Sequence, residues 1–361
     1  MTKFKYINEN TYFYYNDEKE NKRYIICTVG DVHEKKDNIT YLHAIPTYVE
    51  DPEGNRISKY DGKKYSKINL YEVKTFLSNY LVYSKSFGLT IHKIPLAKTE
   101  KEFSPWKFAK KIYKKNFEND YHIIVFKEFI DEMRRYIHLP INKVGVEGSV
   151  LLGLHLKSSD LDILIRGKKI IDVEEVFKIL KSENKISNIT LKKLIQRRKI
   201  YHFVPNKIHK IVHENFELKG IYKNIKIGIM GVREYRDIKL ERDLLKNSVK
   251  KNLGVISFIG HVMEESYNDL LFHPLIFKFK VEKIVEYERS IEKEELKNIK
   301  SGEEIIIMSY LPNYYRYALP GYKTFIRGRL QLMNNGSYRL LLHFYDTYII
   351  NKFTIYPILK I

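Results

Sequence analysis

The sequence predicts an α+β fold in three units, and three observations carry this prediction. Residues 11–50 are rich in β-branched and aromatic residues between polar turns, which is typical of strands. After about residue 144, short apolar strands alternate with helical patterns, and from about residue 254 nearly every segment has a strand pattern. We therefore expect an N-terminal α+β unit (1–100), a mixed-sheet core with a basic flank (101–253) and a β-rich barrel or sandwich (254–361).

The N-terminal unit combines strand patterns with one helical pattern. Its strand segments are TYFYY, RYIICTV and TYLHAIPTYV. Residues 70–86 repeat apolar positions at helical spacing and stop before Gly88, so they predict a helix.

The central unit begins with two expected helices. Ser104 followed by Pro105 is typical of a helix start, because a capping hydroxyl precedes a proline at the first helical position. A second helix is expected at about 121–137. The segments that follow are VGVEGS, LLGLHL, DLDILIRG and VEEVFKILKSE. In that order, they predict a strand that ends in a Gly-Ser turn, a short helix, a strand and a helix.

Two hairpins are expected further along the chain. FELKGIY and IKIGIMGV predict strands joined at Lys223 and Asn224, and they lie between basic segments, 191–204 and 235–251, that predict helices. In the C-terminal unit, Asn335-Gly336 is a strong hairpin turn signal between two strands.

Composition limits the classes of protein to consider. Of the 361 residues, 44% are hydrophobic and 30% are charged, which is typical of a folded chain with real cores. The sequence has no apolar run long enough to span a membrane and no pattern of a signal peptide, so we expect a cytoplasmic protein without a membrane partner. The single Cys27 excludes an internal disulfide framework.

The chain is strongly basic, with a formal net charge of +20. Residues 191–251 hold 17 Lys and Arg against 6 Asp and Glu. An excess of positive charge attracts RNA or DNA, but a solvated basic surface without such a partner explains the charge equally well. Arg327 and Arg329 alternate on one predicted strand, where they could meet phosphate or form a solvated face.

Two carboxylates form the most informative chemical pattern. Asp160 and Asp162 are two residues apart in a predicted strand, so both point to the same face. Like charges this close cost stability unless a cation lies between them. Mg²⁺ is the natural cation, because it binds carboxylate and phosphate oxygens. A pair of such ions can stabilise both oxygens of an in-line phosphoryl displacement.

A turn before these carboxylates suits an anion. Gly148 permits a sharp turn and close approach of the backbone to a ligand. Ser149 begins a short predicted helix, whose free backbone N–H groups suit a phosphate. His155 and Lys157 lie between the two parts and could touch phosphate or belong to a surface loop. His209 and His213 have helical spacing, and we expect them on a polar surface rather than at a zinc ion.

The segment GVEGSVLLGLHLKSSDLDILIRG resembles the signature of the nucleotidyltransferase superfamily that includes DNA polymerase beta. More narrowly, it is similar to a family of archaeal predicted nucleotidyltransferases. The resemblance implies a mixed sheet with flanking helices, Mg²⁺ or Mn²⁺ as cofactor, and a nucleoside triphosphate as substrate. It also implies that Gly148 and Ser149 contact the triphosphate, and that Asp160 and Asp162 are the catalytic metal ligands.

One element of the superfamily pattern is not identified in the sequence. Members usually carry a third acid on a later strand, and Gly228 stands where that acid is expected. Glu217 and Asp237 are nearby acids that fit the pattern poorly.

Two function hypotheses follow. The first is a metal-dependent nucleotidyltransferase that moves a nucleotidyl group to a hydroxyl acceptor, with nucleic acid favoured as the acceptor by the charge. The second is a non-catalytic nucleic-acid-binding protein on a degenerate core.

Overall fold

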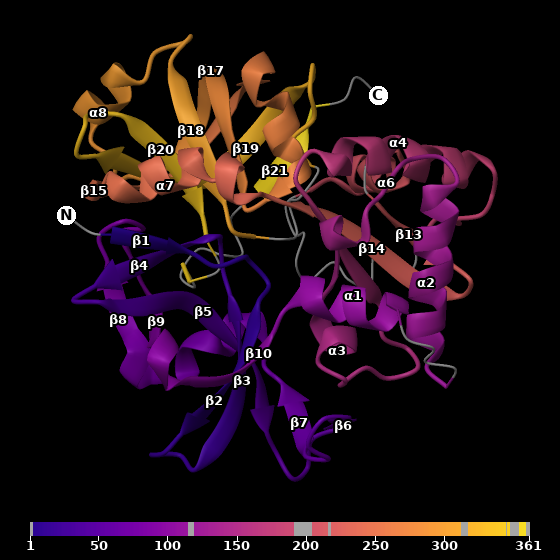
Figure 1. Ribbon diagram of the computed structural model, residues 1–361. Helices are drawn as coiled ribbons and strands as arrows, with labels where there is room; N and C mark the ends of the chain where they lie inside the picture. Colours follow the sequence, from indigo (N-terminus) through magenta and orange to yellow (C-terminus); the bar gives the residue numbers. More distant parts are fainter. Residues whose placement is uncertain are drawn as a thin grey trace. The chain divides into compact units, whose positions relative to one another are not determined.

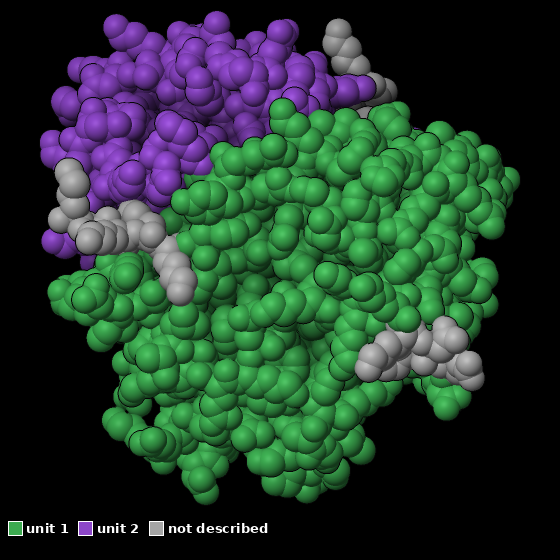
Figure 2. Space-filling view, viewed as in Figure 1, with its two compact units in different colours: residues 1–82, 92–189, 218–238 green, residues 83–91, 190–217, 239–361 purple. Residues whose placement is uncertain are grey.

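The computed structural model describes residues 3–114, 119–190, 204–215, 218–311, 317–343, 345–346 and 354–358. The chain divides into two compact units (Figures 1 and 2). Unit 1 comprises residues 1–82, 92–189 and 218–238, and unit 2 comprises residues 83–91, 190–217 and 239–361. The α+β class is confirmed, while the division at residues 100 and 253 stays a prediction.

The N-terminal part of unit 1 is built from antiparallel strands. They follow the order β1-β4-β5-β3-β2-β10, and β7 and β9 also pair with β5. The long β5 has four neighbours because they pair with different stretches of it: β4 and β9 near its start, β3 and β7 further along. The strands are β1 (Lys3–Tyr6), β2 (Tyr12–Asp17), β3 (Lys22–Thr28), β4 (Val32–Lys36), β5 (Ile39–Glu50), β6 (Arg56–Ile57), β7 (Lys64–Lys67), β8 (Leu81–Ser84), β9 (Leu89–Pro95) and β10 (Thr99–Phe103).

The helix predicted for residues 70–86 is wrong. The chain forms two 3-10 turns, Leu70–Thr75 and Ser78–Tyr80, and then enters β8. Leu77 has a φ of 51°, in the left-handed region that ends helices, and its side chain is buried. The carbonyl of Phe76 accepts a hydrogen bond from the His92 ring at 2.8 Å. Tertiary burial of the apolar positions therefore overrides the helical periodicity.

The central part of unit 1 is a mixed sheet with the order β11-β12-β14-β13. Strands β12 and β14 are parallel, and the other two pairs are antiparallel. The predicted hairpin between β13 and β14 is confirmed, and both of its turn residues have positive φ, as a two-residue type I′ turn requires. The elements are α1 (Pro105–Lys114), α2 (Tyr121–Arg134), β11 (Val144–Val146), α3 (Gly148–Leu151), β12 (Leu161–Arg166), α4 (Lys169–Ser182), β13 (Lys219–Tyr222) and β14 (Ile225–Val232).

Helix α1 begins at Pro105, as predicted, and packs on β11. Trp106 forms a buried cluster with Leu164 and Val232. A Cβ at Gly145 would come within 2.9 Å of the Trp106 ring, so only glycine lets the indole lie against this strand.

In unit 2 the strands close into a barrel. The order is β15-β17-β18-β20-β19, β15 pairs again with β19, and β21 pairs with residues 324–327 of β19, next to the stretch that pairs with β20. This confirms the barrel alternative and removes free edges from the closed strands. The hairpin turn at Asn335-Gly336 is confirmed between β19 and β20. The elements are α6 (Asn206–Asn215), α7 (Lys239–Lys246), β15 (Val249–Val262), β16 (Phe272–His273), β17 (Leu275–Tyr287), α8 (Lys293–Asn298), β18 (Glu304–Ser309), β19 (Lys323–Met333), β20 (Tyr338–Leu342) and β21 (Thr354–Pro357).

A buried polar network joins residues 83–91 to the barrel. The Arg339 guanidinium donates to the Gln331 side-chain oxygen at 2.6 and 2.9 Å and to the Ser86 carbonyl at 2.8 Å. The Gln331 amide donates to the Phe87 carbonyl at 2.7 Å. These bonds satisfy a buried cation, and they explain why a segment from the N-terminal third belongs to unit 2.

Several other predictions in the basic segments and the barrel change. The helix predicted for 235–251 is a 3-10 turn (Tyr235–Asp237) followed by α7, because β15 already begins at Val249. The helix predicted for 191–204 lies outside the described residues except for Val204. Arg327 and Arg329 form ion pairs with Glu286 and Asp346 instead of a free solvated face.

Among the described helices, all are too short or too polar to cross a membrane.

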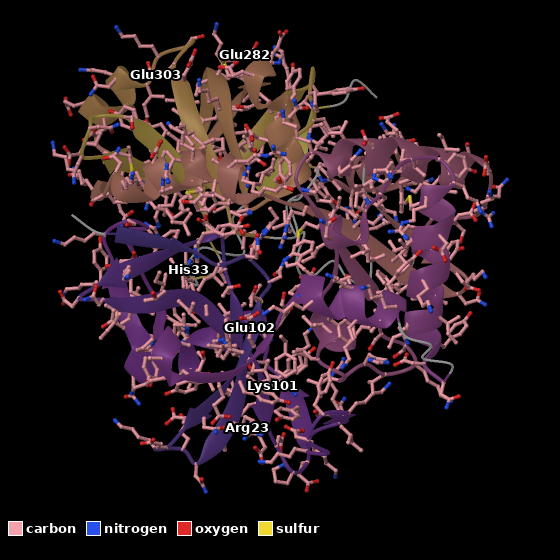
Figure 3. All side chains as sticks on the ribbon, in the orientation of Figure 1. Arg23, His33, Lys101, Glu102, Glu282 and Glu303 are labelled. Carbon is pink, nitrogen blue, oxygen red and sulfur yellow. The ribbon has the colours of Figure 1, made fainter. Side chains whose placement is uncertain are left out.

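The burial of His33 predicts that unit 1 loses stability at acidic pH. This fully buried ring (Figure 3) accepts the His43 backbone N–H at Nδ1 and bonds the Ile7 carbonyl through Nε2. Desolvation lowers the pKa of His33 to about 4. The unfolded chain takes up this proton near pH 6.5, so stability falls as the pH drops from about 6.5 to about 4, by roughly 3 kcal/mol for this group.

Desolvation also lowers the pKa of the buried His92 of unit 1 to about 4, so we expect His33→Gln to remove only the part of the pH dependence that His33 contributes. Urea unfolding at pH 7 and pH 4.5, followed by the fluorescence of the single Trp106 of unit 1, measures it. His138→Gln, at an exposed histidine, is the matched control. An equal pH dependence in the wild type and His33→Gln would contradict the assignment.

Candidate functional site

The site lies at the start of β12, where β11 and β12 pair. The antiparallel register continues past Val146 and Ile163 to Glu147 and Asp162, and the Glu147 N–H donates to the Asp162 carbonyl at 3.0 Å. Residues directly opposite each other on paired strands project their side chains to the same face. The Glu147 and Asp162 carboxylates are therefore direct neighbours on one face of the sheet.

The parallel neighbour β14 completes this row. Asp162 is in register with Gly228, and Gly228 is in turn in register with Lys219 on β13. A Cβ at Gly228 would lie 3.3 Å from Asp162 Oδ1 and 3.8 Å from Lys219 Cγ. The row thus consists of two acids, a glycine and a lysine, and even a Cβ at the glycine would crowd the Asp162 carboxylate.

Asp160 lies one step along the same face. Its Oδ1 is 3.4 Å from Nζ of Lys226, two residues before Gly228 on β14. Both aspartates are partly exposed, which suits side chains that must meet a ligand. Strand β14 therefore presents an ammonium group to the first aspartate and the backbone of Gly228 to the second.

The turn predicted to hold phosphate lies against the second aspartate. Gly148 has a φ of 65°, a left-handed conformation that favours glycine. Its Cβ position is 3.4 Å from Asp162 Oδ2, so a side chain here would crowd the carboxylate. Ser149 follows in α3, a helix of only four residues. The structure thus brings Gly148, Ser149 and Asp162 together, and their assigned roles in binding stay predictions.

The third acid expected on a later strand is absent from β14. Gly228 holds the register position, Asp237 lies beyond the far end of β14, and Glu217 is outside the described residues. Glu147 instead adds a carboxylate beside Asp162, from the other neighbouring strand. Desolvation, followed by the charges of Asp162 and Glu9, raises the pKa of Glu147 well above its usual range. The signal was present in the sequence, because Glu147 directly precedes Gly148.

N-terminal strands of unit 1 contribute groups around these acids. Glu9 is buried and acts electrostatically on Glu147. Burial and then the charge of Glu147 raise the pKa of the Cys27 thiol. Burial, with Asp162 as a further cause, also raises the pKa of Tyr48. Strands β3 and β5 therefore form part of the wall of the site, a contribution that the sequence did not predict.

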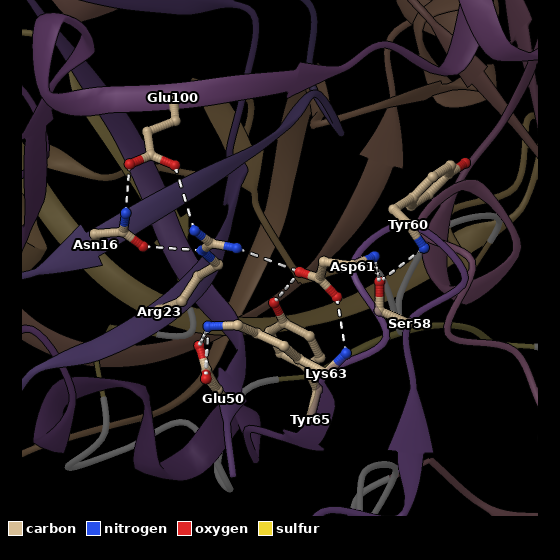
Figure 4. A network of polar contacts seen from close by, with 9 residues as sticks. All are labelled: Asn16, Arg23, Glu50, Ser58, Tyr60, Asp61, Lys63, Tyr65 and Glu100. Carbon is tan, nitrogen blue, oxygen red and sulfur yellow. Dashed lines mark hydrogen bonds and ion pairs between the residues drawn. The ribbon is translucent and has the colours of Figure 1, made fainter. Parts of the chain in front are cut away.

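The loop before β7 is fixed against α3. The Tyr60 hydroxyl donates to the Leu151 carbonyl at 2.8 Å, and the Lys59 N–H donates to the Gly153 carbonyl at 3.1 Å. Figure 4 shows how Asp61 holds this loop. Its carboxylate accepts from the Tyr65 hydroxyl at 2.8 Å, the Lys63 N–H at 3.1 Å and Arg23 at 3.3 Å.

The predicted roles of several histidines change. His155 and Lys157 lie in the loop after α3, where the His155 ring contacts Asp120 and Lys157 is exposed. His209 and His213 are buried in α6 of unit 2, so the expectation of a polar surface is wrong. One ligand atom each from Asp120, His122 and His155 lies within 4.8 Å of the others. Sequence reasoning missed this group because residues 120–122 and 155 meet only in the fold.

Part of the chain is similar to a known domain. Residues 123–227 match the nucleotidyltransferase domain. An uncharacterized protein of the archaeon Methanocaldococcus jannaschii is 23% identical over 270 residues, which cover 68% of this chain and 74% of that protein. No solved structure matches the chain. The resemblance to archaeal nucleotidyltransferases is confirmed, and the domain supports nucleotidyl transfer in general and an enzyme of that class.

The opposed acids predict a site that is destabilising in the free protein. We expect Glu147→Gln to raise the free energy of unfolding by about 1 kcal/mol at pH 8, because burial and the charge of Asp162 disfavour the ionised carboxylate in the folded protein, whereas Gln carries no charge. Urea unfolding without divalent ions measures the change. The matched control is Asp160→Asn, which removes a partner of the Lys226 ammonium and should give no gain. A loss of stability in Glu147→Gln would contradict the inferred repulsion.

Proposed function

We propose that this protein is a metal-dependent nucleotidyltransferase that moves a nucleotidyl group from a nucleoside triphosphate to a hydroxyl. The observation that carries the proposal is the row of Glu147 and Asp162, which lies beside Asp160 and against the Gly148 turn. The match of residues 123–227 to the nucleotidyltransferase domain supports it. The net charge of +20 favours an RNA or DNA acceptor.

The residues present fit a hard divalent cation. Carboxylate oxygens are the ligands that Mg²⁺ and Mn²⁺ prefer, and two adjacent carboxylates on one face are stabilised by such an ion. Asp160 and Asp162 would hold it, with Lys226 able to leave Asp160 because its side chain is partly exposed. The ion, when bound, would neutralise charge on the triphosphate and on the departing pyrophosphate.

In the proposed reaction each chain group has one task. The backbone at Gly148 and the Ser149 residue hold the triphosphate next to Asp162. A bond forms between the acceptor hydroxyl oxygen and the α-phosphorus, and the bond from that phosphorus to the pyrophosphate oxygen breaks. Glu147 accepts the proton of the hydroxyl at its carboxylate. This assigns to Glu147 the part that the superfamily usually gives to an acid on a later strand.

A specific observation favours a second candidate function. Strand β14 offers Lys226 and Gly228 to the two aspartates in place of an acid. The missing acid on β14, together with the basic residues of 191–251, favours the hypothesis that the protein binds nucleic acid without transferring nucleotides. The two functions differ in whether a nucleoside triphosphate binds with Mg²⁺.

Binding of the four ribonucleoside triphosphates tests the proposal. We expect Mg²⁺-dependent binding of at least one of them by the wild type, and its loss when Asp160 and Asp162 are both replaced by Asn, because the metal then lacks its ligands. The matched control is Asp172→Asn, an exposed carboxylate of α4 paired with Lys169, which should bind like the wild type. Titration calorimetry with and without Mg²⁺ gives the affinities. Wild type that binds no triphosphate, yet binds RNA or DNA in a salt-dependent way, would favour the second function.

The role of Glu147 is tested separately. We expect Glu147→Gln to keep triphosphate binding while lowering nucleotidyl transfer about 100-fold or more, the usual effect of losing a general base. Transfer is followed as pyrophosphate release with RNA, DNA and protein acceptors. Transfer at the wild-type rate by Glu147→Gln would exclude the carboxylate as the base.

A further inference from the structure

A second group of metal-ligating side chains lies apart from the aspartates in unit 1. Asp120 is the N-cap of α2, His122 is in the first turn of that helix, and His155 is in the loop that follows α3. One ligand atom from each lies within 4.8 Å of the others. Two imidazoles and a carboxylate are the ligand set of zinc-class transition metals, whereas Mg²⁺ prefers oxygen ligands.

The orientation of His122 suits a metal ligand. Its ring is buried, and Nε2 lies 3.0 Å from the Ser159 carbonyl, so Nε2 must carry the proton and donate it. This bond fixes the tautomer and leaves the lone pair on Nδ1. Metal-binding histidines commonly donate their other ring N–H to a backbone carbonyl in this way. The His122 and His155 ring centroids are 4.8 Å apart.

Neither neutral tautomer of His155 satisfies its surroundings. Nε2 lies 3.1 Å from Asp120 Oδ2 and 3.1 Å from Nζ of Lys59, and Nδ1 is buried without a hydrogen-bond partner among the described residues. A proton on Nε2 faces the ammonium of Lys59, and a proton on Nδ1 is buried and unbonded. With the proton on Nδ1, the lone pair of Nε2 points to the cation beside Asp120, which is the arrangement of an imidazole that binds a metal.

Lys59 places a positive charge on the same ligands. Its ammonium is 2.8 Å from Asp120 Oδ2, yet its side chain is 54% exposed. The backbone of this loop is held by the Asp61 network (Figure 4), so only the flexible side chain has to move away. An exposed ion pair of this kind costs little to break.

We propose that Asp120, His122 and His155 bind a divalent transition metal of the zinc class, and that the metal displaces the ammonium of Lys59. Three protein ligands leave a coordination position for water or another ligand. The loop from Gly153 to Asp160 carries His155 and Ser159, so the bound metal ties this loop to the start of α2. The ion thereby fixes the approach to Asp160, and its binding does not depend on nucleotidyl transfer.

Zn²⁺ binding to the full chain, freed of metal by a chelator, tests the proposal. Competition with a chromogenic chelator gives the affinity, and Co²⁺ in place of Zn²⁺ gives a visible spectrum that reports nitrogen ligands. We expect a single saturable site in the wild type. His122→Gln and His155→Gln, which keep hydrogen-bonding side chains, should each weaken binding about tenfold or more. Lys59→Ala should tighten it about fivefold, since the competing ammonium is gone.

Control variants separate this site from others. His138→Gln removes an exposed histidine outside the group and should leave the affinity unchanged, as should the double replacement of Asp160 and Asp162 by Asn. Circular dichroism checks that each variant is folded. The proposal is overturned by a wild type without saturable Zn²⁺ binding, by histidine variants that bind normally, by unchanged affinity in Lys59→Ala, or by loss of binding in the double aspartate variant.

Discussion

The pairing of β11 with β12 is the constraint on which the candidate site depends. It sets Glu147 opposite Asp162 and carries the chain from Glu147 into the left-handed turn at Gly148, which lies against the same carboxylate. A fold gains nothing in stability from two opposed acids on one face. In the proposed function a cation would offset this cost, and the same pairing leads into the turn at Gly148 that is proposed to hold the phosphate of a substrate.

The rest of unit 1 supports this pairing from two sides. Trp106 of α1 packs against β11 at Gly145, on the face of the sheet that also carries Glu147, because residues two apart on a strand point to the same face. The loop of Lys59 and Tyr60 bonds the backbone just after α3, and the Asp61 network holds that loop. N-terminal strands thus act on the site although they lie outside the residues that match the nucleotidyltransferase domain.

Lysines balance the acids of unit 1 in a consistent way. Lys226 contacts Asp160, and Lys59 contacts Asp120. Both lysine side chains are at least partly exposed. Each ammonium group can therefore move away from its aspartate and stay in contact with water.

The sequence by itself determined the local elements and the chemistry of one segment. Turn residues fixed the hairpins at Lys223-Asn224 and Asn335-Gly336, the Ser-Pro pair fixed the start of α1, and strand alternation put Asp160 and Asp162 on one face. These features depend on neighbours in the chain, so they are visible without a fold. Only the tertiary structure decided that residues 70–86 are not a helix, that Glu147 faces Asp162, and that His155 meets Asp120 and His122. Strand register and burial bring together residues far apart in sequence, and no local pattern encodes those distances.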